Sequence, residues 1–406
     1  MARRRPILAG LDIGTHTVAI VIAEQTDSGL EILGVGTALS RGMRAGRLVD
    51  VEKTTQDIGV ALSEAELMAG CEIHQVTVSV SGDHLRGTNS HGVVAIDNGE
   101  VTSWAARRVI EAAQAVPLPT DQEILHLMCR EFVVDGAGGI PDPVGLRGVR
   151  LEAHLHVISA CESVLANLER CCHKAGLSVQ QIIASSLASA EAVLDPAEKE
   201  VGVGLIDFGA GTVDIAIYHG GSVVHSAVLP MAGSFITHDL AQCLETSLRE
   251  AESIKLRYGC ADETTVDTHG YIEVTGMGGR PPRLVSRRFI AEIIQPRVEE
   301  ILEQVQQSIE RSGYAERLTS GVVLTGGSSM MPGVVDVAAA TIGLPARLGE
   351  PLGCSGLIEE IDDASWATAV GLARGLRSTD LGSRRSQGWL PRVLPEWVWR
   401  RWRGYA

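Results

Sequence analysis

Apolar runs that end in short glycine-rich turns recur along the chain, and they predict its strands. Ile7 to Ile13 is apolar and β-branched enough for a strand, Gly14 to Thr17 suits a tight turn, and Val18 to Ala23 continues as a second strand. Asp12 stands just before the turn. The pattern predicts a β-hairpin with an acidic residue beside its turn.

The same arrangement returns about two hundred residues further along the chain. An apolar run ends at Ile206, Asp207 follows, and the turn 209–212 separates it from a second apolar run, Val213 to Tyr218. Two hairpins of the same form at the start of two halves indicate an internal duplication. Each half would then contribute one loop to a shared site.

A third glycine-rich loop lies in "GVVLTGGSSMMPGV". Gly321 to Leu324 predicts a buried strand, Thr325 to Ser328 a loop, and Pro332 the opening of a helix, since proline is tolerated at the first helical position. Each loop alone is typical of an ordinary turn. The three loops together, in this order, favour a ligand site.

Helical patterns fill much of the remaining chain. Residues 286–313 carry apolar side chains at intervals of three and four, which predicts a core-facing helix, and Pro296 predicts that it is kinked or divided. Small residues dominate 187–194 and 367–373. Side chains of this size allow two helices to cross closely between two lobes.

The composition limits the class of protein. At 406 residues and 45% hydrophobic, the chain is long enough for two or more domains. The formal net charge is −15, but residues 384–406 hold six arginines and one acid, so the rest of the chain carries −20. This charge argues against nucleic-acid binding by the body of the protein. Any basic function lies in the tail.

The cysteines and the N-terminus suggest no metal site and no membrane span. The eight cysteines show no CxxC pair and no spacing with histidine that suits zinc, so we expect small buried thiols in a reducing cytoplasm. The apolar run of "MARRRPILAG" is too short for a signal peptide. We find no uncharged stretch of 18 apolar residues that could span a membrane.

The chemistry of the three loops suits a nucleotide. Glycine lets backbone N–H groups approach phosphate oxygens, threonine hydroxyls add donors, and an aspartate can hold a hydrated Mg²⁺. A Gly-Gly pair at the end of a strand permits flat contact with a base or sugar. The loops therefore predict a site for ATP and Mg²⁺.

The order of the "DIGTHT", "DFGAGTVD" and "TGG" loops resembles the actin-like ATPases. The resemblance implies an α/β fold of two lobes, built from duplicated RNase H-like domains, that close over ATP and Mg²⁺. Stretches such as "GVGTALSRGMRAGRLVD", "PVGLRGVRLEAHLHVIS" and "GGRPPR" narrow it to the bacterial cell division family FtsA, over essentially the whole chain. That family adds an inserted small subdomain, 1C, and a C-terminal amphipathic helix.

The resemblance divides the chain into these parts: subdomain 1A in 1–82 and 158–199, the SHS2-like subdomain 1C in 83–157, subdomain 2A in 200–228, subdomain 2B in 229–300, the rest of 2A with the return to the first lobe in 301–378, a linker in 379–388 and a membrane-targeting tail in 389–406. Composition alone leaves open that 83–157 is ordinary lobe structure.

The family's motifs also imply the nucleotide-binding residues. They are Asp12, Gly14, Thr15, His16 and Thr17 from the first lobe, Asp207, Gly209, Ala210, Gly211, Thr212, Asp214 and Gly233 from the second, and Glu252, Lys255, Gly326, Gly327 and Ser328 around the ribose and base. Asp12 and Asp207 are the expected Mg²⁺ ligands, acting through water. Glu252 and Lys255 lie one helical turn apart, and a plain surface ion pair is the alternative for them.

ATP hydrolysis is expected to be slow or absent. Actin-like ATPases usually supply a glutamate or glutamine that positions the attacking water. The matching stretch, "IIASSLASAEAVL", offers Ser185 and Ser186 instead, with Glu191 further along. We therefore expect no catalytic residue of this kind, and nucleotide that acts as a switch for conformation and polymerisation.

Basic side chains in the predicted 2B region suggest a peptide partner. Arg283, Arg287 and Arg297 lie in an otherwise acidic chain, and a solvated helix face is the bland interpretation. The FtsA resemblance implies instead that they receive the C-terminal peptide of the tubulin-like protein FtsZ. It also implies filaments of the chain itself, and docking of later cell division proteins on subdomain 1C.

The last residues, "WLPRVLPEWVWRRWRGYA", predict an anchor on a membrane surface. Pro391 and Pro395 limit a helix to about 395–404. The expected lipid-contacting residues are Trp389, Leu390, Val393, Leu394, Trp397, Val398, Trp399, Arg400, Arg401, Trp402 and Arg403. The alternative is a terminal helix that packs its tryptophans on the body or on a partner chain.

The resemblance implies a tether between FtsZ filaments and anionic lipid on the cytoplasmic face of the inner membrane, at the division septum. Two other classes share the fold: an actin-like pilus-assembly scaffold similar to PilM, and a sugar or acetate kinase. Neither accounts for the Trp/Arg tail, and fold alone does not decide among the three.

Overall fold

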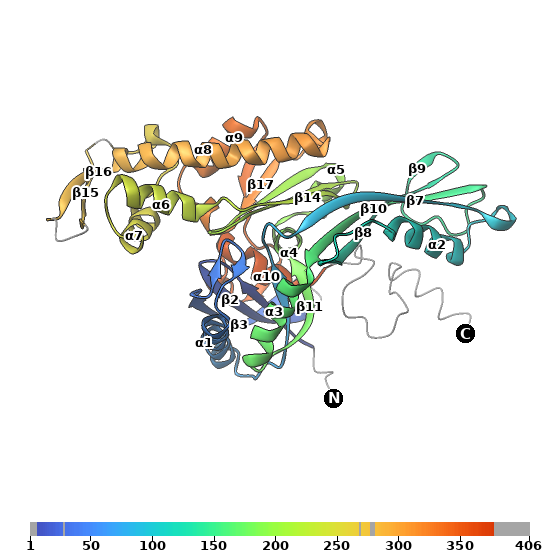
Figure 1. Ribbon diagram of the computed structural model, residues 1–406, viewed down its shortest axis with the longest axis horizontal. Helices are drawn as coiled ribbons and strands as arrows, with labels where there is room; N and C mark the ends of the chain where they lie inside the picture. The colour runs from blue at the N-terminus through green and yellow to red at the C-terminus, as the bar shows by residue number, and fades with distance from the viewer. Residues whose placement is uncertain (1–5, 27–28, 268, 277–280, 377–406) are drawn as a thin grey trace.

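Two β-sheets with the same strand order form the centres of two lobes (Figure 1). The computed structural model describes residues 6–26, 29–267, 269–276 and 281–376. In the first lobe, three antiparallel strands are followed by two parallel ones, and a short edge strand completes the sheet: β1 (Ile7–Ile13), β2 (Thr17–Thr26), β3 (Gly29–Leu39), β6 (Gln75–Val80), β11 (Ser178–Ala184) and β19 (Cys354–Gly356).

The sheet of the second lobe repeats this plan. Its antiparallel strands and the two parallel strands that follow are β12 (Val203–Phe208), β13 (Val213–His219), β14 (Ser222–Leu229), β17 (Val322–Thr325) and β18 (Ala346–Leu348). In each lobe the first strand of the hairpin lies at the centre, between its antiparallel partner and a parallel strand. The predicted duplication and the actin-like α/β fold are therefore confirmed.

Helices cover both sheets. Those of the first lobe and the lobe junction are α1 (Val51–Ala69), α3 (Glu162–Lys174), α4 (Ser185–Val193) and α10 (Ala367–Arg374). Those of the second lobe are α5 (Pro196–Val201), α6 (Gly233–Cys243), α7 (Leu248–Tyr258), α8 (Arg287–Ser312) and α9 (Val334–Ile342). The small hairpins β4 (Met43–Arg44) with β5 (Arg47–Leu48), and β15 (Tyr271–Val274) with β16 (Arg283–Ser286), extend from the two lobes.

Helices α4 and α10 cross between the sheets with almost no side chain separating them. A Cβ atom added to Gly371 of α10 would lie 1.8 Å from the carbonyl oxygen of Ala188 in α4. A Cβ atom added to Gly10 of β1 would lie 2.2 Å from the carbonyl oxygen of Ala369. The predicted close crossing of two small-residue helices is thus confirmed.

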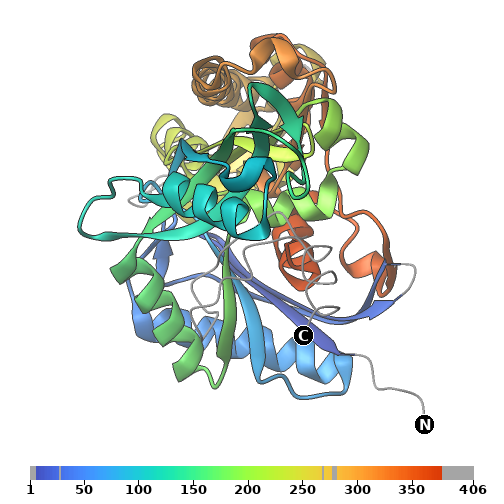
Figure 2. The ribbon, with the colours of Figure 1, turned by 90° about the vertical axis from the view of Figure 1, so that its right-hand side faces the viewer.

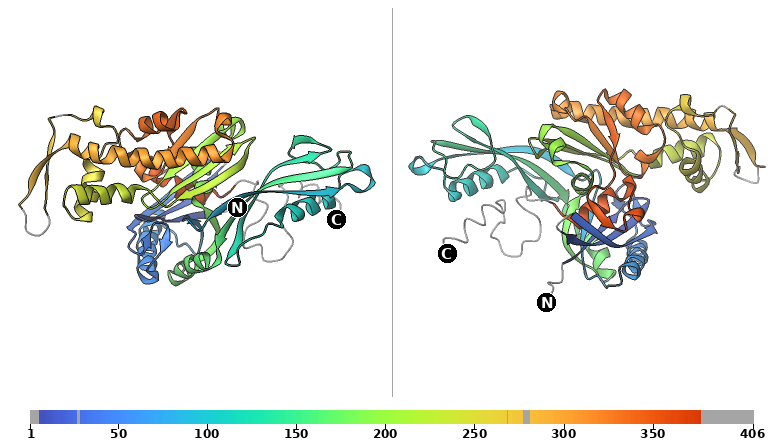
Figure 3. Two further views of the ribbon diagram at one scale, coloured as in Figure 1. Left: turned by 45° about the horizontal axis from the view of Figure 1, so that its top comes forward. Right: turned by 180° about the vertical axis from the view of Figure 1, so that it is seen from behind.

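A separate four-stranded sheet is inserted into the first lobe. Its elements are β7 (Arg86–Ala95), α2 (Ser103–Gln114), β8 (Gln122–Val134), β9 (Ala137–Ile140) and β10 (Arg150–Cys161), with the strand order β7-β10-β8-β9. It has its own buried core, which includes Ile110, Phe132, Leu151 and Leu155. The insertion projects from one side of the molecule, and the β15-β16 hairpin from the other (Figures 1 and 3). Figure 2 views the molecule from the free end of the insertion, which lies in front of both lobes.

Two local predictions were wrong, namely a division of the helix at Pro296 and the opening of a helix by Pro332. Helix α8 continues through Pro296 for 26 residues instead of dividing there, because buried side chains such as Ile294 and Val298 hold both sides of the proline in one core. Helix α9 begins at Val334 after an N-terminal cap at Gly333, so Pro332 precedes the helix and does not open it. For α8, tertiary packing decided the element's bounds.

Candidate nucleotide site

The three predicted loops meet in one cleft between the lobes. The cleft has a volume of about 470 Å³ and is lined by residues from both sheets and from α7. Of the 17 predicted nucleotide-binding residues, 16 line it: Asp12, Gly14, Thr15, His16, Thr17, Asp207, Gly209, Ala210, Gly211, Thr212, Asp214, Glu252, Lys255, Gly326, Gly327 and Ser328. Gly233 lies directly behind the lining, with its carbonyl oxygen 3.1 Å from Nζ of Lys255.

The two hairpin turns fold in the same way. The backbone N–H of Gly14 donates to the carbonyl oxygen of Thr17 at 3.0 Å, and that of Gly209 donates to Thr212 at 3.0 Å. A Cβ atom on Gly211 would lie 2.2 Å from Oγ1 of Thr15. Glycine is therefore required at Gly211, where the loops of the two lobes face each other.

Three aspartates gather at the floor of the cleft. Asp207 and Asp214 are 7% and 3% exposed, and Asp12 is partly buried. Burial raises the pKa of Asp12 to about 7, against a hydrogen bond from Ser79 at 2.6 Å. Burial, followed by repulsion from Asp207, raises the pKa of Asp214 to about 7. The pKa of Asp207 is also raised by burial. Negative charge is thus costly here unless a cation or a set of donors balances it.

The lobe junction itself orients Asp207. Its Oδ2 atom accepts hydrogen bonds from Ser189 of α4 at 2.6 Å and from Thr368 of α10 at 3.1 Å. The two crossing helices therefore hold the acidic side chain in place. Movement at this junction would change its position.

The residues present fit a hydrated Mg²⁺ beside phosphates. Carboxylate oxygens are ligands that Mg²⁺ prefers, and in nucleotide sites it usually takes one or two of them and completes its shell with water and phosphate. Asp12 and Asp207 can supply that number. Within the described ranges, no cluster of three or more acidic, His or Cys side chains is arranged to hold a metal ion alone, so the remaining ligands would come from water and phosphate.

Lys255 is buried and pairs with the partly buried Glu252, so the two do not form a plain surface pair. The ammonium of Lys255, 7% exposed, contacts Glu252 Oε2 at 2.8 Å, Thr237 Oγ1 at 2.9 Å and the carbonyl oxygen of Gly233. Burial acts to raise the pKa of Glu252, but Lys255 and Thr237 outweigh it, so the pKa is lowered. All three ammonium protons have acceptors within the lobe, so Lys255 shapes the cleft wall and joins α6 to α7.

Sequence reasoning missed Ser81 and the contacts that join the lobes across the cleft. Oγ of Ser81 lies 2.7 Å from both carboxylate oxygens of Asp214 and 2.9 Å from Oγ1 of Thr212. Nδ1 of His16 lies 3.9 Å from Oε1 of Glu252. The available clue was the polar alternation of "VTVSVSGDH" at the end of a strand. Other unpredicted lining residues are Ile13, Gly46, Leu256, Gly259, Met330, Met331, Pro332, Ser365 and Thr368.

The candidates for water activation occupy different places. Ser185 lines the cleft, whereas Ser186 lies at a separate small pocket near the insertion. Glu191 pairs with Nζ of Lys199 at 2.7 Å and does not line the cleft. The carboxylates that do line it are Asp12, Asp207, Asp214 and Glu252.

The three arginines predicted for peptide binding are not gathered at one point. Arg283 donates to the carbonyl oxygen of Leu244 at 3.0 Å, and the guanidinium of Arg287 lies 6.0 Å from the ring centre of Tyr258. Arg297 lies ten residues further along α8, about 15 Å from Arg287 by helical rise. There it forms a forked ion pair with Asp239.

The predicted tail and linker, residues 379–406, lie outside the described residues. This includes every predicted lipid-contacting residue from Trp389 to Arg403 and both prolines. None of the helices in the described part of the chain is both long enough and apolar enough to cross a membrane.

Comparisons with known structures place the fold. The chain superposes on the PilM-PilN type IV pilus biogenesis complex with a TM-score of 0.65 and 17% identity, over 91% of this chain and 98% of that one. MreB5 of Spiroplasma citri bound to ADP gives a TM-score of 0.54 at 14% identity, over 91% of this chain and 95% of that one. At such identities the likeness concerns the actin-like fold alone.

Sequence comparisons are more specific. A family model described as "Cell division protein FtsA" matches residues 204–371, and one described as "SHS2 domain inserted in FTSA" matches 82–159. Proteins named cell division protein FtsA are 44% identical in Pseudomonas aeruginosa, over 90% of this chain and 88% of that protein, and 41% identical in Neisseria meningitidis, over 92% and 90%. That of Escherichia coli K12 is 38% identical over 91% and 90%. The chain therefore belongs to the FtsA family of actin-like cell division proteins.

Proposed function

We propose that the chain binds ATP and Mg²⁺ in the interlobe cleft and tethers FtsZ filaments to the cytoplasmic membrane during septum formation. The observation that carries the nucleotide proposal is the convergence of two matching glycine turns, one from each lobe, above three aspartates, of which two are buried and one is partly buried. The backbone N–H of Gly211 would face the phosphates, while that of Gly14 closes its own turn. Gly326, Gly327 and Ser328 would face the sugar and base, with Leu256 and Met331 as apolar walls.

In this proposal Mg²⁺ screens the charge of the phosphates. Asp12 and Asp207 would hold the hydrated ion, and Ser79, Ser189 and Thr368 keep their carboxylates oriented. The positive charge would also favour the ionised form of these acids, whose pKa values burial raises.

Calorimetric titration of ATP into the full chain tests this proposal. Gly211→Val would place a side chain against Thr15, so binding should fall by at least about tenfold, while Gly59→Ala, in an open position on α1, should leave binding unchanged. Binding should also weaken when EDTA removes Mg²⁺. Full affinity in Gly211→Val, or no ATP binding by the parent chain, would refute it.

Nucleotide would act as a switch, with slow hydrolysis at best. The cleft carboxylates are either shared with the Mg²⁺ site or engaged by Ser81 and Lys255, and Glu191 is held by Lys199. A steady-state phosphate-release assay checks this. Fast turnover without added partners would overturn it.

The FtsZ tail peptide is proposed to dock on the 2B region beside β16 and the start of α8. Exposed apolar side chains there, Leu284 at 74% and Phe289 at 42%, lie next to Arg283 and Arg287 in sequence and could pair with an acidic, apolar peptide. Arg297 would contribute only by giving up its bond to Asp239.

Charge reversal separates these roles. Arg283→Glu should weaken binding of the FtsZ C-terminal peptide in fluorescence anisotropy, whereas the distant exposed Arg317→Glu should not. Arg297→Glu tests whether Arg297 also contributes to peptide binding. Unchanged affinity in both Arg283→Glu and Arg297→Glu would remove the proposal.

Membrane attachment is proposed for residues 389–406, on the strength of their tryptophan and arginine content. A chain that ends at residue 388 should still bind ATP but should no longer float with anionic liposomes. Retained flotation would contradict the anchor. With the anchor and the FtsZ contact on one molecule, the chain would sit at the septum, form filaments there and offer the inserted subdomain to later division proteins.

A pilus-assembly role is less well supported. The likeness to the PilM complex concerns fold at 17% identity, whereas the FtsA relatives share 36–44% identity with this chain. Mixing the protein with lipid vesicles and FtsZ filaments discriminates the two, since only the tether is expected to bind both at once.

A further inference from the structure

We infer that the hairpin of β4 and β5 links the phosphate loops to the root of the inserted subdomain, through the ion pair of Arg47 with Asp83. Nucleotide bound between the lobes would then alter the mobility of the insertion. Arg47 and Asp83 are positioning residues in this account, since neither lines the cleft. The inference rests on the proposed nucleotide function.

The base of the hairpin is fixed to the first lobe. Nε and Nη2 of Arg41 donate to Oδ1 of Asp57 in α1 at 2.8 and 2.6 Å, and the backbone N–H of Arg41 donates to Oδ2 at 2.7 Å. The N–H groups of Val49 and Asp50 both donate to the carbonyl oxygen of Gly42. Because its base is held at several points, displacement of the hairpin is confined to its tip.

The tip lies against the phosphate loops of both lobes. The backbone N–H of Gly46 donates to Oγ1 of Thr15 at 3.0 Å. A Cβ atom on Gly46 would lie 3.1 Å from Cγ2 of Thr212, and one on Gly211 would lie 2.9 Å from Cα of Ala45. The tip has positive φ angles, 47° at Ala45 and 72° at Gly46, which suit a tight two-residue turn. A shift of either loop toward a phosphate therefore displaces the tip.

Arg47 carries that displacement to the insertion. Its Nε and Nη2 atoms lie 3.0 and 2.7 Å from Oδ1 of Asp83, and Nη2 lies 2.6 Å from Oδ2, which is a forked geometry. The guanidinium lowers the pKa of Asp83. Asp83 follows Ser81, which contacts Asp214 across the cleft. The pair thus joins the hairpin to the segment where the chain leaves the first lobe.

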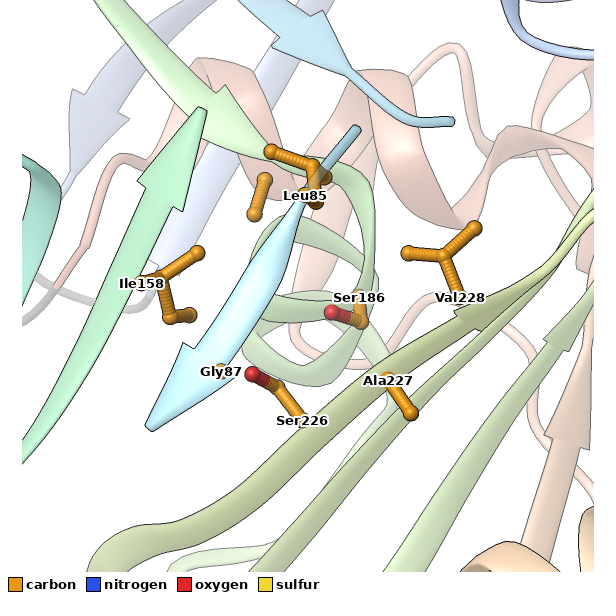
Figure 4. Close-up of a pocket in the computed structure, with 8 residues that line it drawn as sticks. Leu85, Gly87, Ile158, Ser186, Ser226, Ala227 and Val228 are labelled. Carbon is orange, nitrogen blue, oxygen red and sulfur yellow. The ribbon is translucent and has the colours of Figure 1, made fainter. Parts of the chain in front are cut away.

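The root of the insertion also touches the second lobe. Leu85 and Gly87 lie opposite Ser226, Ala227 and Val228 of β14 around a small pocket (Figure 4). The root is therefore placed between the two lobes, where a change in their separation reaches it directly.

Two polar contacts hold the strands at this junction. Nδ2 of Asn89 in β7 donates to the carbonyl oxygen of Val224 at 3.0 Å. Nε2 of His156 in β10 lies 2.8 Å from Oγ of Ser226, and its Nδ1 lies 2.7 Å from Oδ1 of Asn89. Burial lowers the pKa of His156 to about 3, so the ring stays neutral and acts as a spacer between strands. The insertion is thus attached to the second lobe by β7 and β10, and to the hairpin by Asp83.

Hydrogen–deuterium exchange on the full chain tests the link, with ADP or the ATP analogue AMPPNP in the presence of Mg²⁺. We expect nucleotide to slow exchange in peptides that cover residues 82–96. Arg47→Glu and Asp83→Arg should each reduce that slowing by at least about threefold, since one partner of an exposed pair is lost. The double variant, which restores the pair in reverse, should recover it.

Controls separate this inference from the proposed function. Arg150→Glu removes another arginine ion pair, with the partly buried Glu152 of the insertion, and should leave the response intact. ATP affinity measured by calorimetry should stay within about threefold of the parent in all variants. If the parent binds no nucleotide, the proposed function fails and this inference with it.

If the parent binds nucleotide, three results would overturn the link alone. They are an unchanged exchange response in the single variants, no recovery in the double variant, and no nucleotide effect on residues 82–96.

Discussion

The buried carboxylate of Asp214 should make the nucleotide-free protein less stable as pH rises, and Asp214→Asn should remove this effect. Asp214 is 3% exposed, and burial together with repulsion from Asp207 raises its pKa from 3.8 to about 7. Asparagine keeps the shape and can still bond with Ser81 and Thr212. The substitution therefore removes the charge with little change in packing.

The sign and size of the effect follow from linkage. Between pH 4 and pH 7 the folded state keeps a proton on Asp214 that the unfolded state has released, so folding stability falls as pH rises through this range. A shift of about three pKa units corresponds to about 4 kcal/mol above pH 7. From pH 5 to pH 8 the parent should lose about 3 kcal/mol of folding stability through this group, and Asp214→Asn should not show that loss.

Urea unfolding of nucleotide-free protein in EDTA, at pH 5 and pH 8, measures the difference. Asp262→Asn is a control of opposite sign, because hydrogen bonds from Thr264 lower the pKa of Asp262 and favour its charged form. Asp262→Asn should therefore be no more stable than the parent at pH 8. The reasoning fails if the parent and Asp214→Asn lose the same stability between the two pH values.

Four further substitutions test the packing with the same unfolding assay. Gly371→Ala should cost at least about 3 kcal/mol, because its Cβ meets the backbone of Ala188, while Gly59→Ala, a helical position in open space, should gain about 1 kcal/mol. Equal changes in stability for the two glycine substitutions would contradict the close crossing of α4 and α10. Pro296→Ala should stabilise α8 by about 2 kcal/mol by restoring a backbone donor, and a loss would show that the ring packs favourably. Lys255→Met should cost about 2 kcal/mol because it removes the cation from the partly buried carboxylate of Glu252, and a neutral result would mean that the pair is dispensable.

The cleft loops could be predicted because their conformation is local. Asp12 with Gly14, and Asp207 with Gly209, lie within a few residues of each other, and their turns close by hydrogen bonds over three residues. The role of Ser81 could not be predicted in the same way. Its partners lie more than 130 residues further along the chain, and only the approach of the two lobes brings them together.

Packing against distant elements also explains the local errors. Pro296 lacks a donor and predicts a break, but the core on both sides of it continues the helix. The sequence suggested a peptide-binding role for Arg297, with a solvated helix face as the alternative, whereas in the structure Arg297 is held by Asp239 from another helix, α6. A single sequence gives the charge of a side chain but not the neighbour that neutralises it.

The crossing of α4 and α10 constrains how the sequence can vary among relatives. With a Cβ clash of 1.8 Å at Gly371 and 2.2 Å at Gly10, neither glycine can be replaced unless the opposite backbone moves. That backbone carries Ser189 and Thr368, which orient Asp207. We therefore expect Gly10, Ser189, Thr368 and Gly371 to vary together. An alignment of relatives should show them either all unchanged or replaced together, even where the surrounding helix surface varies.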